Sequence, residues 1–477
     1  MLFNSFEFLV FLPIVFALYW LLRKRVRWQN ALIVVASYVF YGWWDWRFLI
    51  LIAFTTLCSF VSGLGIERAE GDRRRQKWIS AGNIIINLLV LGCFKYLNFF
   101  GENFSHLLQL LGLTADWTTL NIILPVGVSF YTFQALSYTI DVYRGKMQPT
   151  HDPVAFFAFI GFFPQLVAGP IERAANLLPQ FQKQRRFTYE EGADGMRQIL
   201  WGMFKKVVIA DNCALVVNKV FADYYTMQSS TLILGALLFT IQIYCDFSGY
   251  SDIAIGTGKL FNIRLMRNFN NPYFSRDIAE FWRRWHISLT TWFRDYIYIP
   301  LGGSRTTKGK ILRNTFVIFL VSGLWHGANW TFVCWGTYHA LLFLPLILLG
   351  MNRKYTNIVA EGHLFPTLKE CFQMGLTFIL AAIGWIIFRS ETIGQAWEYM
   401  VGLCTHWGEG YMDANCSPLL LVGIPLMLLV EWLTRSRNHG LDIAHLPIWL
   451  RYTSYIAILS MILLFCGTEQ TFIYFQF

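Results

Sequence analysis

Long runs of apolar residues, separated by short polar segments, recur along the whole chain of 477 residues. An α-helix rises about 1.5 Å per residue, so a run of about 20 apolar residues crosses a hydrocarbon core about 30 Å thick. No polar segment is long enough for an independent soluble domain. The pattern therefore predicts an all-α polytopic membrane protein with a single domain over residues 1–477. The candidate spans are residues 5–22, 30–46, 48–66, 79–100, 120–141, 200–222, 231–250, 314–350, 371–388, 418–434 and 451–466.

Two apolar segments do not fit a single crossing. Residues 314–350 are too long for one span, and glycines on both sides of His326 predict a break in the helix. Residues 154–172 must dip into the membrane and return, as irregular backbone can where protein surrounds it. With these segments we expect about 11–12 transmembrane helices together with re-entrant and interfacial helices.

Basic residues gather on alternate sides of the predicted spans. Clusters of Arg and Lys follow the first, third and fifth spans, whereas residues 101–119, 223–230 and 390–417 contain neither. The positive-inside rule places the basic loops in the cytoplasm. We therefore expect a periplasmic N-terminus and a multi-pass protein of the plasma membrane.

Composition agrees with this class. Hydrophobic residues make up 55% of the chain and charged residues 14%, whereas soluble domains carry about 25% charged residues. The net charge of +10 resides in short clusters beside apolar runs, which indicates membrane topology and not nucleic-acid binding. The nine cysteines form no CxxC pair and no metal-like grouping, so we expect no bound metal.

His326 is the first candidate for chemistry. The limb at residues 314–325 would span about 18 Å at about 1.5 Å per residue, so His326 is expected at membrane depth. An imidazole in lipid must face a polar cavity or a partner. A buried neutral histidine suits a general base that activates a hydroxyl against a thioester carbonyl. A histidine hydrogen-bonded between helices is the structural alternative.

His286 is the second candidate. Apolar residues recur at intervals of three and four over residues 276–299, which predicts one amphipathic helix along the cytoplasmic interface, begun by Ser275. Arg284 is expected on the solvated face of this helix. His286 lies at the edge of the apolar face, where it can point into the protein, and an ordinary interfacial histidine is the alternative.

Asp246 is the third candidate. It follows a long apolar run and shares a helical face with Tyr250, four residues later. A carboxylate in such a place marks either a cavity or a buried polar network. Both interpretations stay open.

Several motifs around these residues resemble the membrane-bound O-acyltransferase family, and most closely its bacterial alginate O-acetylase branch. They are FEFLVFLP at residues 6–13, LPVGVSFYTFQ at 124–134, FPQLVAGPI at 163–171, FIYFQF at 472–477 and the segments around Asp246, His286 and His326. The resemblance implies many helices around a central tunnel, with His326 and His286 as the two catalytic histidines near its narrow point. The residues expected to line the substrate tunnel are Asp246, Ser248, Tyr250, Trp282, Trp325 and Asn329.

The resemblance also implies substrates and partners. It suggests an acetyl donor on the cytoplasmic side, either acetyl-CoA or an acylated carrier protein, which is a substrate and not a bound cofactor. The expected partners are membrane lipids, a cytoplasmic donor protein and a periplasmic acetyltransferase that places the acetyl group on a polysaccharide. Nucleic acid is not among them.

The expected function is O-acetylation of a secreted or cell-wall polysaccharide, first an alginate-like exopolysaccharide, from the bacterial inner membrane. Acylation of peptidoglycan or teichoic acid is the alternative within the resemblance. Composition alone fits a transporter or a flippase of lipid-linked sugars equally well. Such proteins often show paired inverted repeats, which the sequence does not display.

Overall fold

The computed structural model describes residues 1–113, 117, 120, 123–408, 417–465, 470 and 472–473. Over these residues the chain is helical and contains no strand, which confirms the all-α prediction. The chain divides into two compact units. The first comprises Met1–Ala193 and Thr257–Met266, and the second comprises Asp194–Gly256 and Arg267–Phe477. The expectation that residues 1–477 form a single domain stays a prediction.

The first unit contains the predicted N-terminal spans. Its segment at 154–172 forms two short helices that break at Phe162, and Asp152 caps the first of them by accepting from the Val154 N–H at 2.9 Å. Whether this segment is re-entrant stays a prediction. The helices are α1 (Phe6–Leu21), α2 (Val26–Asp45), η1 (Trp46–Phe48), α3 (Leu49–Arg68), α4 (Arg73–Lys95), α5 (Leu97–Leu110), α6 (Val128–Tyr143), α7 (Pro153–Gly161), α8 (Phe163–Leu166) and α9 (Ala174–Gln182).

The second unit contains both candidate histidines. Two of its segments, η2 and η5, are short π-helices, a form that often marks functional sites. Its helices, with α10 and α12 beginning or ending in the first unit, are α10 (Tyr189–Met203), η2 (Phe204–Ala210), α11 (Asp211–Ala222), η3 (Tyr224–Thr226), α12 (Ser229–Leu260), η4 (Pro272–Phe274), α13 (Ile278–Arg284), α14 (Ile287–Phe293), η5 (Arg294–Tyr298), α15 (Lys308–His326), α16 (Trp330–Leu348), α17 (Leu368–Arg389), α18 (Ile393–Thr405), α19 (Pro418–Leu433) and α20 (Ile448–Leu464).

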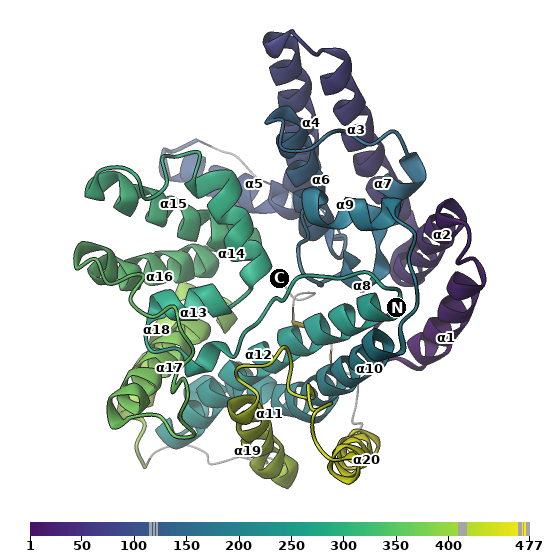
Figure 1. The fold of residues 1–477 in the computed structure, drawn as a ribbon. Coiled ribbons are helices and arrows are strands. Elements are labelled where there is room, and N and C mark those ends of the chain that lie inside the picture. The colour runs from purple at the N-terminus through teal and green to yellow at the C-terminus, as the bar shows by residue number, and fades with distance from the viewer. Residues whose placement is uncertain are drawn as a thin grey trace. The chain divides into compact units, whose positions relative to one another are not determined.

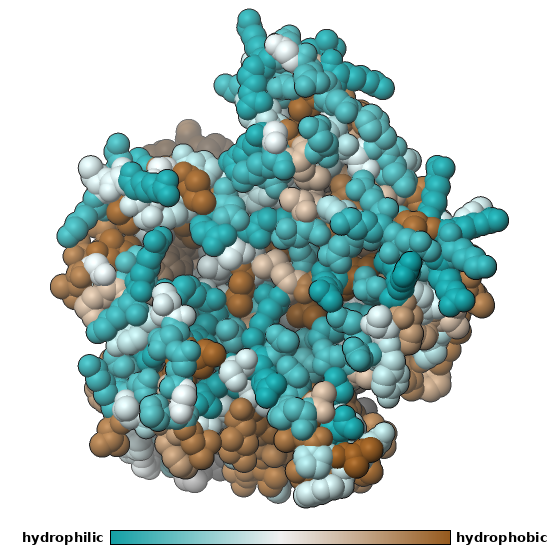
Figure 2. All heavy atoms as spheres, viewed as in Figure 1, coloured by the Kyte–Doolittle hydropathy of each residue, from teal (hydrophilic) through white to brown (hydrophobic). Residues whose placement is uncertain are grey.

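The helices have the length and surface of membrane spans. Among the described residues, five helical stretches are long and apolar enough to cross a bilayer: Val26–Arg68, Arg73–Lys95, Ser229–Leu260, Trp330–Leu348 and Leu368–Arg389. Helices α1, α19 and α20 are apolar but shorter. Figure 2 shows hydrophobic residues exposed over α19 and α20, where Leu421 is 74% and Leu463 is 72% exposed. The polytopic class is confirmed, and the total of 11–12 spans stays a prediction.

The helix break at His326 is confirmed. Helix α15 ends at His326, and α16 begins at Trp330 after a turn in which Asn329 caps α16 by accepting from the Thr331 N–H at 3.0 Å. The depth of His326 in the membrane stays a prediction. Helix α15 begins at Lys308 and has 19 residues, or about 28 Å at about 1.5 Å per residue. Its first turns carry Lys308, Lys310 and Arg313, so the uncharged part of α15 still begins near Asn314 and the predicted depth is unchanged.

Glycines hold α15 and α16 side by side (Figure 1). A Cβ atom at Gly323 would collide with the carbonyl oxygen of Phe332, and one at Gly336 would collide with the carbonyl oxygen of Phe319. Small residues at these positions let the two backbones approach closely, as in many membrane helix pairs. This contact fixes the position of the last turn of α15, which carries His326.

Gly323→Ala is therefore expected to destabilise the protein. Alanine favours a helix by about 0.5–1 kcal/mol over glycine, but the collision with a backbone carbonyl costs about 1–3 kcal/mol. The matched control is Gly309→Ala in the same helix, where an added Cβ meets nothing within 4 Å. Thermal unfolding of the detergent-purified variants measures the difference. Equal melting temperatures for the two variants would mean that the glycine contact does not hold the helices together.

The prediction of one continuous helix over residues 276–299 is wrong. The segment forms α13, α14 and the π-helix η5, with a break at Trp285 and His286. His286 has a φ of +43°, in the left-handed region, which His adopts more readily than most residues. The spacing of three and four residues predicted one helix because the apolar residues of both short helices follow that same spacing and are buried.

Part of the charged face of this segment is buried, although Arg283 and Arg294 are exposed. Glu280 is 1% and Arg284 is 7% exposed, and their side chains pair at 2.7 Å. Arg276 also binds Glu280, at 3.0 Å. The helix is capped by Asp277, which accepts from the Glu280 N–H at 2.6 Å, and not by Ser275. The expectation of a solvated Arg284 is therefore wrong, because its guanidinium is buried against Glu280.

Candidate active site

His286 and His326 line the same cavity in the second unit. The cavity has a volume of about 490 Å³ and is enclosed by α13, α14, η5, α15 and the end of α16. Both histidines are buried, with exposures of 1% and 5%. The exposed arginines Arg283, Arg294 and Arg353 line the same cavity. Its lining therefore combines two buried imidazoles with three exposed arginines, which form its cationic edge.

Aromatic side chains surround His326. The ring centroids of Trp325, Trp335 and Phe388 lie 5.0, 5.1 and 5.2 Å from that of His326, each close to perpendicular. The Trp325 ring also lies 5.9 Å from that of His286, so one indole contacts both imidazoles. This packing holds the two histidines in fixed orientations beside the cavity.

His286 is positioned by Asn268. The Nδ1 atom of His286 lies 3.1 Å from Oδ1 of Asn268. The same oxygen accepts from the backbone N–H of Ser288 at 3.3 Å and from its hydroxyl at 2.9 Å. The Nδ2 group of Asn268 donates to the Ser251 hydroxyl at 3.1 Å. Because a backbone N–H can only donate, the Asn268 atom that faces it must be the oxygen.

This orientation determines the tautomer of His286. Burial lowers the pKa of His286, which lies outside the long apolar helices, to about 3, so the ring is neutral at physiological pH. A neutral imidazole carries one N–H, and Nδ1 must carry it in order to donate to the Asn268 oxygen. Nε2 then holds the lone pair. Asn268 thus sets which nitrogen of His286 can accept a proton or a hydrogen bond.

The predicted tunnel residues fall into two groups. Trp282 lines the cavity, and Trp325 contacts both histidines. Asn329 does not line it: it caps α16, and its amide donates to the Glu391 carbonyl at 2.8 Å. The central tunnel itself, and the roles of all these residues, stay predictions.

Neither Asp246 nor Tyr250 lines the cavity, and Asp246 lies in a buried polar network. Asp246 pairs with Lys206 at 2.7 Å and accepts from the Ile473 N–H at 2.8 Å. Lys206 also pairs with Asp211 at 2.8 Å. Tyr250 packs against Phe472, with ring centroids 4.9 Å apart. Of the two interpretations left open for Asp246, this geometry favours the polar network.

Ser248 belongs to a neighbouring pocket. Its hydroxyl accepts from Lys205 at 2.9 Å, and Lys205 pairs with Asp252 at 2.6 Å. This small pocket has a volume of about 20 Å³ and is lined by Ser251 and Asn268 as well. The amide of Asn268 therefore lies between this polar pocket and His286.

Three features of the site were not predicted from the sequence. Asn268 lies in a segment without periodicity or motif, so nothing marks it before the fold is known. The arginines Arg283, Arg294 and Arg353 are distant in sequence and meet only through the break after α13 and the turn after α16. The third feature is His339 in α16, which is 0% exposed and lies 4.9 Å from Trp282 between ring centroids.

Comparison with known proteins identifies the family. Residues 149–379, which include both histidines, match the family model of the membrane-bound O-acyltransferases. A probable alginate O-acetylase, AlgI, of Pseudomonas aeruginosa is 44% identical over 83% of this chain and 74% of its own length. The chain belongs to the membrane-bound O-acyltransferase family. The predicted resemblance is thereby confirmed, including its alginate O-acetylase branch.

Other members of the membrane-bound O-acyltransferase family are also similar. A peptidoglycan O-acetyltransferase of Helicobacter pylori is 32% identical over 100% of this chain and 98% of its own length. A teichoic acid D-alanyltransferase of Bacillus subtilis is 31% identical over 57% of this chain and 70% of its own length. The names of these relatives thus share the transfer of an acyl group and differ in the acceptor and in the group transferred.

Proposed function

We propose that this protein transfers an acetyl group from a cytoplasmic thioester donor across the bacterial inner membrane, for O-acetylation of a secreted or cell-wall polysaccharide. The observation that carries the proposal is that one cavity is lined by both buried histidines and by three arginines. The names of the alginate O-acetylases support an alginate-like exopolysaccharide as the first acceptor.

His326 acts as the general base in this proposal. One of its imidazole nitrogens takes the proton of the acceptor hydroxyl as the hydroxyl oxygen bonds to the thioester carbonyl carbon. Collapse of the tetrahedral intermediate breaks the carbon–sulfur bond, and the departing thiolate takes the proton from the imidazolium. No net proton is consumed. The aromatic rings around His326 exclude water, which would otherwise compete for the acyl group.

His286 and the arginines hold the donor. An accepting Nε2 on His286 suits an N–H of a pantetheine-type arm, the group shared by acetyl-CoA and acylated carrier proteins. Arg283, Arg294 and Arg353 suit its phosphate, because guanidinium groups bind phosphate with paired hydrogen bonds. The donor is then a substrate. The proposal extends to a periplasmic N-terminus and a periplasmic acetyltransferase partner, which the charge pattern and the resemblance suggest.

Peptidoglycan is the second candidate acceptor. The Helicobacter pylori peptidoglycan O-acetyltransferase matches this chain from end to end. In the test, the protein is expressed in a host that lacks its own relative, and ester-linked acetate is measured separately on exopolysaccharide and peptidoglycan. We expect acetate on the exopolysaccharide with the wild type and none with His326→Ala. Acetate on peptidoglycan alone would change the acceptor, and acetate on neither would contradict the function.

Asn268→Leu is expected to lower kcat/KM about 10-fold to 100-fold, since it removes a hydrogen bond to a buried imidazole, a loss of about 1–3 kcal/mol. Asn268→Asp keeps the acceptor oxygen and should restore most activity at high pH. Its carboxylate raises the pKa of His286, so activity should fall as acidification protonates the ring. Ser251→Ala is the matched control, because it leaves the Asn268–His286 contact intact. A flat pH profile for Asn268→Asp would rule out the tautomer role.

A further inference from the structure

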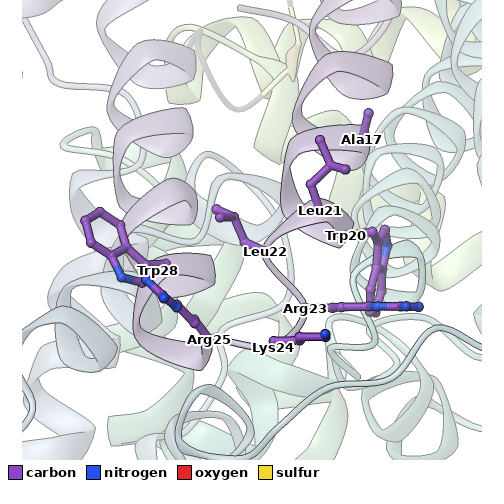
Figure 3. A pocket seen from close by; sticks show the side chains of 8 residues that line it. All are labelled: Ala17, Trp20, Leu21, Leu22, Arg23, Lys24, Arg25 and Trp28. Carbon is purple, nitrogen blue, oxygen red and sulfur yellow. The ribbon is translucent and has the colours of Figure 1, made fainter.

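A surface groove lies in the first unit where α1 ends and α2 begins (Figure 3). Its volume is about 890 Å³. Three consecutive cations, Arg23, Lys24 and Arg25, line it together with Trp20, Leu21 and Trp28. A second hollow of about 630 Å³ shares Trp20, Arg23 and Lys24 with it. The two hollows therefore form one continuous basic and aromatic surface.

The cations of this groove are exposed and have no acidic partner among the residues that the structure describes. Nearby Arg185 differs, because it is buried and binds Asn30 at 2.6 Å. Three adjacent positive charges without a counter-charge repel one another and attract an anion. Trp28 is 58% exposed beside them, and Trp side chains favour the boundary between lipid and water.

An apolar stripe leads away from the groove along α1. It consists of Val10, Ile14, Leu18 and Leu21, which are 46%, 54%, 44% and 78% exposed and recur at intervals of three and four residues. Such residues share one face of a helix. A ligand in the groove would thus meet cations at one end and a continuous apolar helix face at the other.

We propose that this groove binds an anionic phospholipid of the surrounding membrane. The phosphate lies against Arg23, Lys24 and Arg25, the glycerol region against Trp28, and an acyl chain along the stripe of α1. Basic pockets beside membrane helices bind anionic headgroups in this way. The stripe favours a lipid over a soluble phosphate compound, because only a lipid carries the chains that cover it.

The test uses the purified full chain in neutral detergent with phosphatidylglycerol, phosphatidylcholine or soluble glycerol phosphate added. The rise in melting temperature with increasing concentration gives an apparent affinity for each added compound. The groove variant is Arg23→Gln with Lys24→Gln and Arg25→Gln. The control variant is Arg74→Gln with Arg75→Gln and Lys77→Gln. These three cations are exposed at the start of α4, and replacing them changes the net charge by the same amount.

We expect phosphatidylglycerol to stabilise the wild type and the control variant more than phosphatidylcholine does. In the groove variant the affinity for phosphatidylglycerol should fall about fivefold for each cation removed. An equal fall in both variants would show a non-specific charge effect and overturn the proposal. If glycerol phosphate stabilised the wild type as much as phosphatidylglycerol does, the ligand would be a soluble phosphate and the proposal would be overturned. Equal stabilisation by phosphatidylcholine would also overturn it, because the groove would then not select an anionic lipid. A groove variant that does not fold is replaced by Lys24→Gln alone.

Discussion

His326→Ala is expected to transfer acetyl groups about 10²–10⁴ times more slowly than the wild type at saturating donor. The loss should fall on kcat, because the variant lacks proton transfer in the transition state but keeps the cationic edge and His286. Since three aromatic rings contact the imidazole, alanine also leaves a small void, and we expect a modest fall in melting temperature.

Two further variants separate chemistry from packing. His326→Gln fills most of the void but is a poor base, so it should be more stable than His326→Ala and no more active. His363→Ala, at an exposed position, is the matched histidine control and should behave as the wild type. The measurement is labelled acetyl transfer from a thioester donor by purified protein, beside thermal unfolding. High activity of His326→Gln would contradict the role of base.

Lys206→Ala is expected to destabilise the protein by about 3–5 kcal/mol, the largest effect on stability that we predict. Lys206 lies 2.7 Å from Asp246 and 2.8 Å from Asp211, and all three residues are buried. Removing the ammonium group takes a shared cation away from two buried carboxylates, and breaking a buried ion pair by removing one partner is strongly destabilising.

Lys310→Ala is the matched control, since Lys310 is exposed and its loss should change stability by less than about 0.5 kcal/mol. Denaturation in detergent, followed by loss of the folded elution peak, measures both. If Lys206→Ala were as stable as the control, the network would have no structural role, and Asp246 would again be a candidate for the substrate path.

Much of the fold could be predicted because lipid imposes a simple rule. Most of the apolar runs became helices, although the helix in residues 120–141 begins only at Val128 and the run at 79–100 is divided at Tyr96. The glycines beside His326 ended α15 there. The first residues of the helices could not be predicted as well. Helix α15 begins at Lys308, in charged turns that precede its apolar part. Hydropathy detects the apolar part alone.

The site was predicted in part. The two histidines share a cavity as the resemblance implied, but periodicity could not show the break at His286, where the left-handed backbone depends on contacts with Asn268. The sequence cannot tell whether Asp246 and Ser248 line a cavity or lie in a buried network. Their neighbours in the chain are the same whether the side chains meet a substrate or a lysine. Only the structure places Lys206 and Lys205 beside them.

Transfer rate against donor concentration, for His286→Ala, His326→Ala and the double variant, tests most directly whether the two histidines serve one bound donor. We predict that high donor concentration restores much of the activity of His286→Ala, whose defect is mainly in KM, and restores none in His326→Ala. The double variant should show both defects. Normal acetyl transfer by a folded His326→Ala protein would contradict the catalytic role of this histidine. A folded His286→Ala protein that is inactive at every donor concentration would contradict the division of roles.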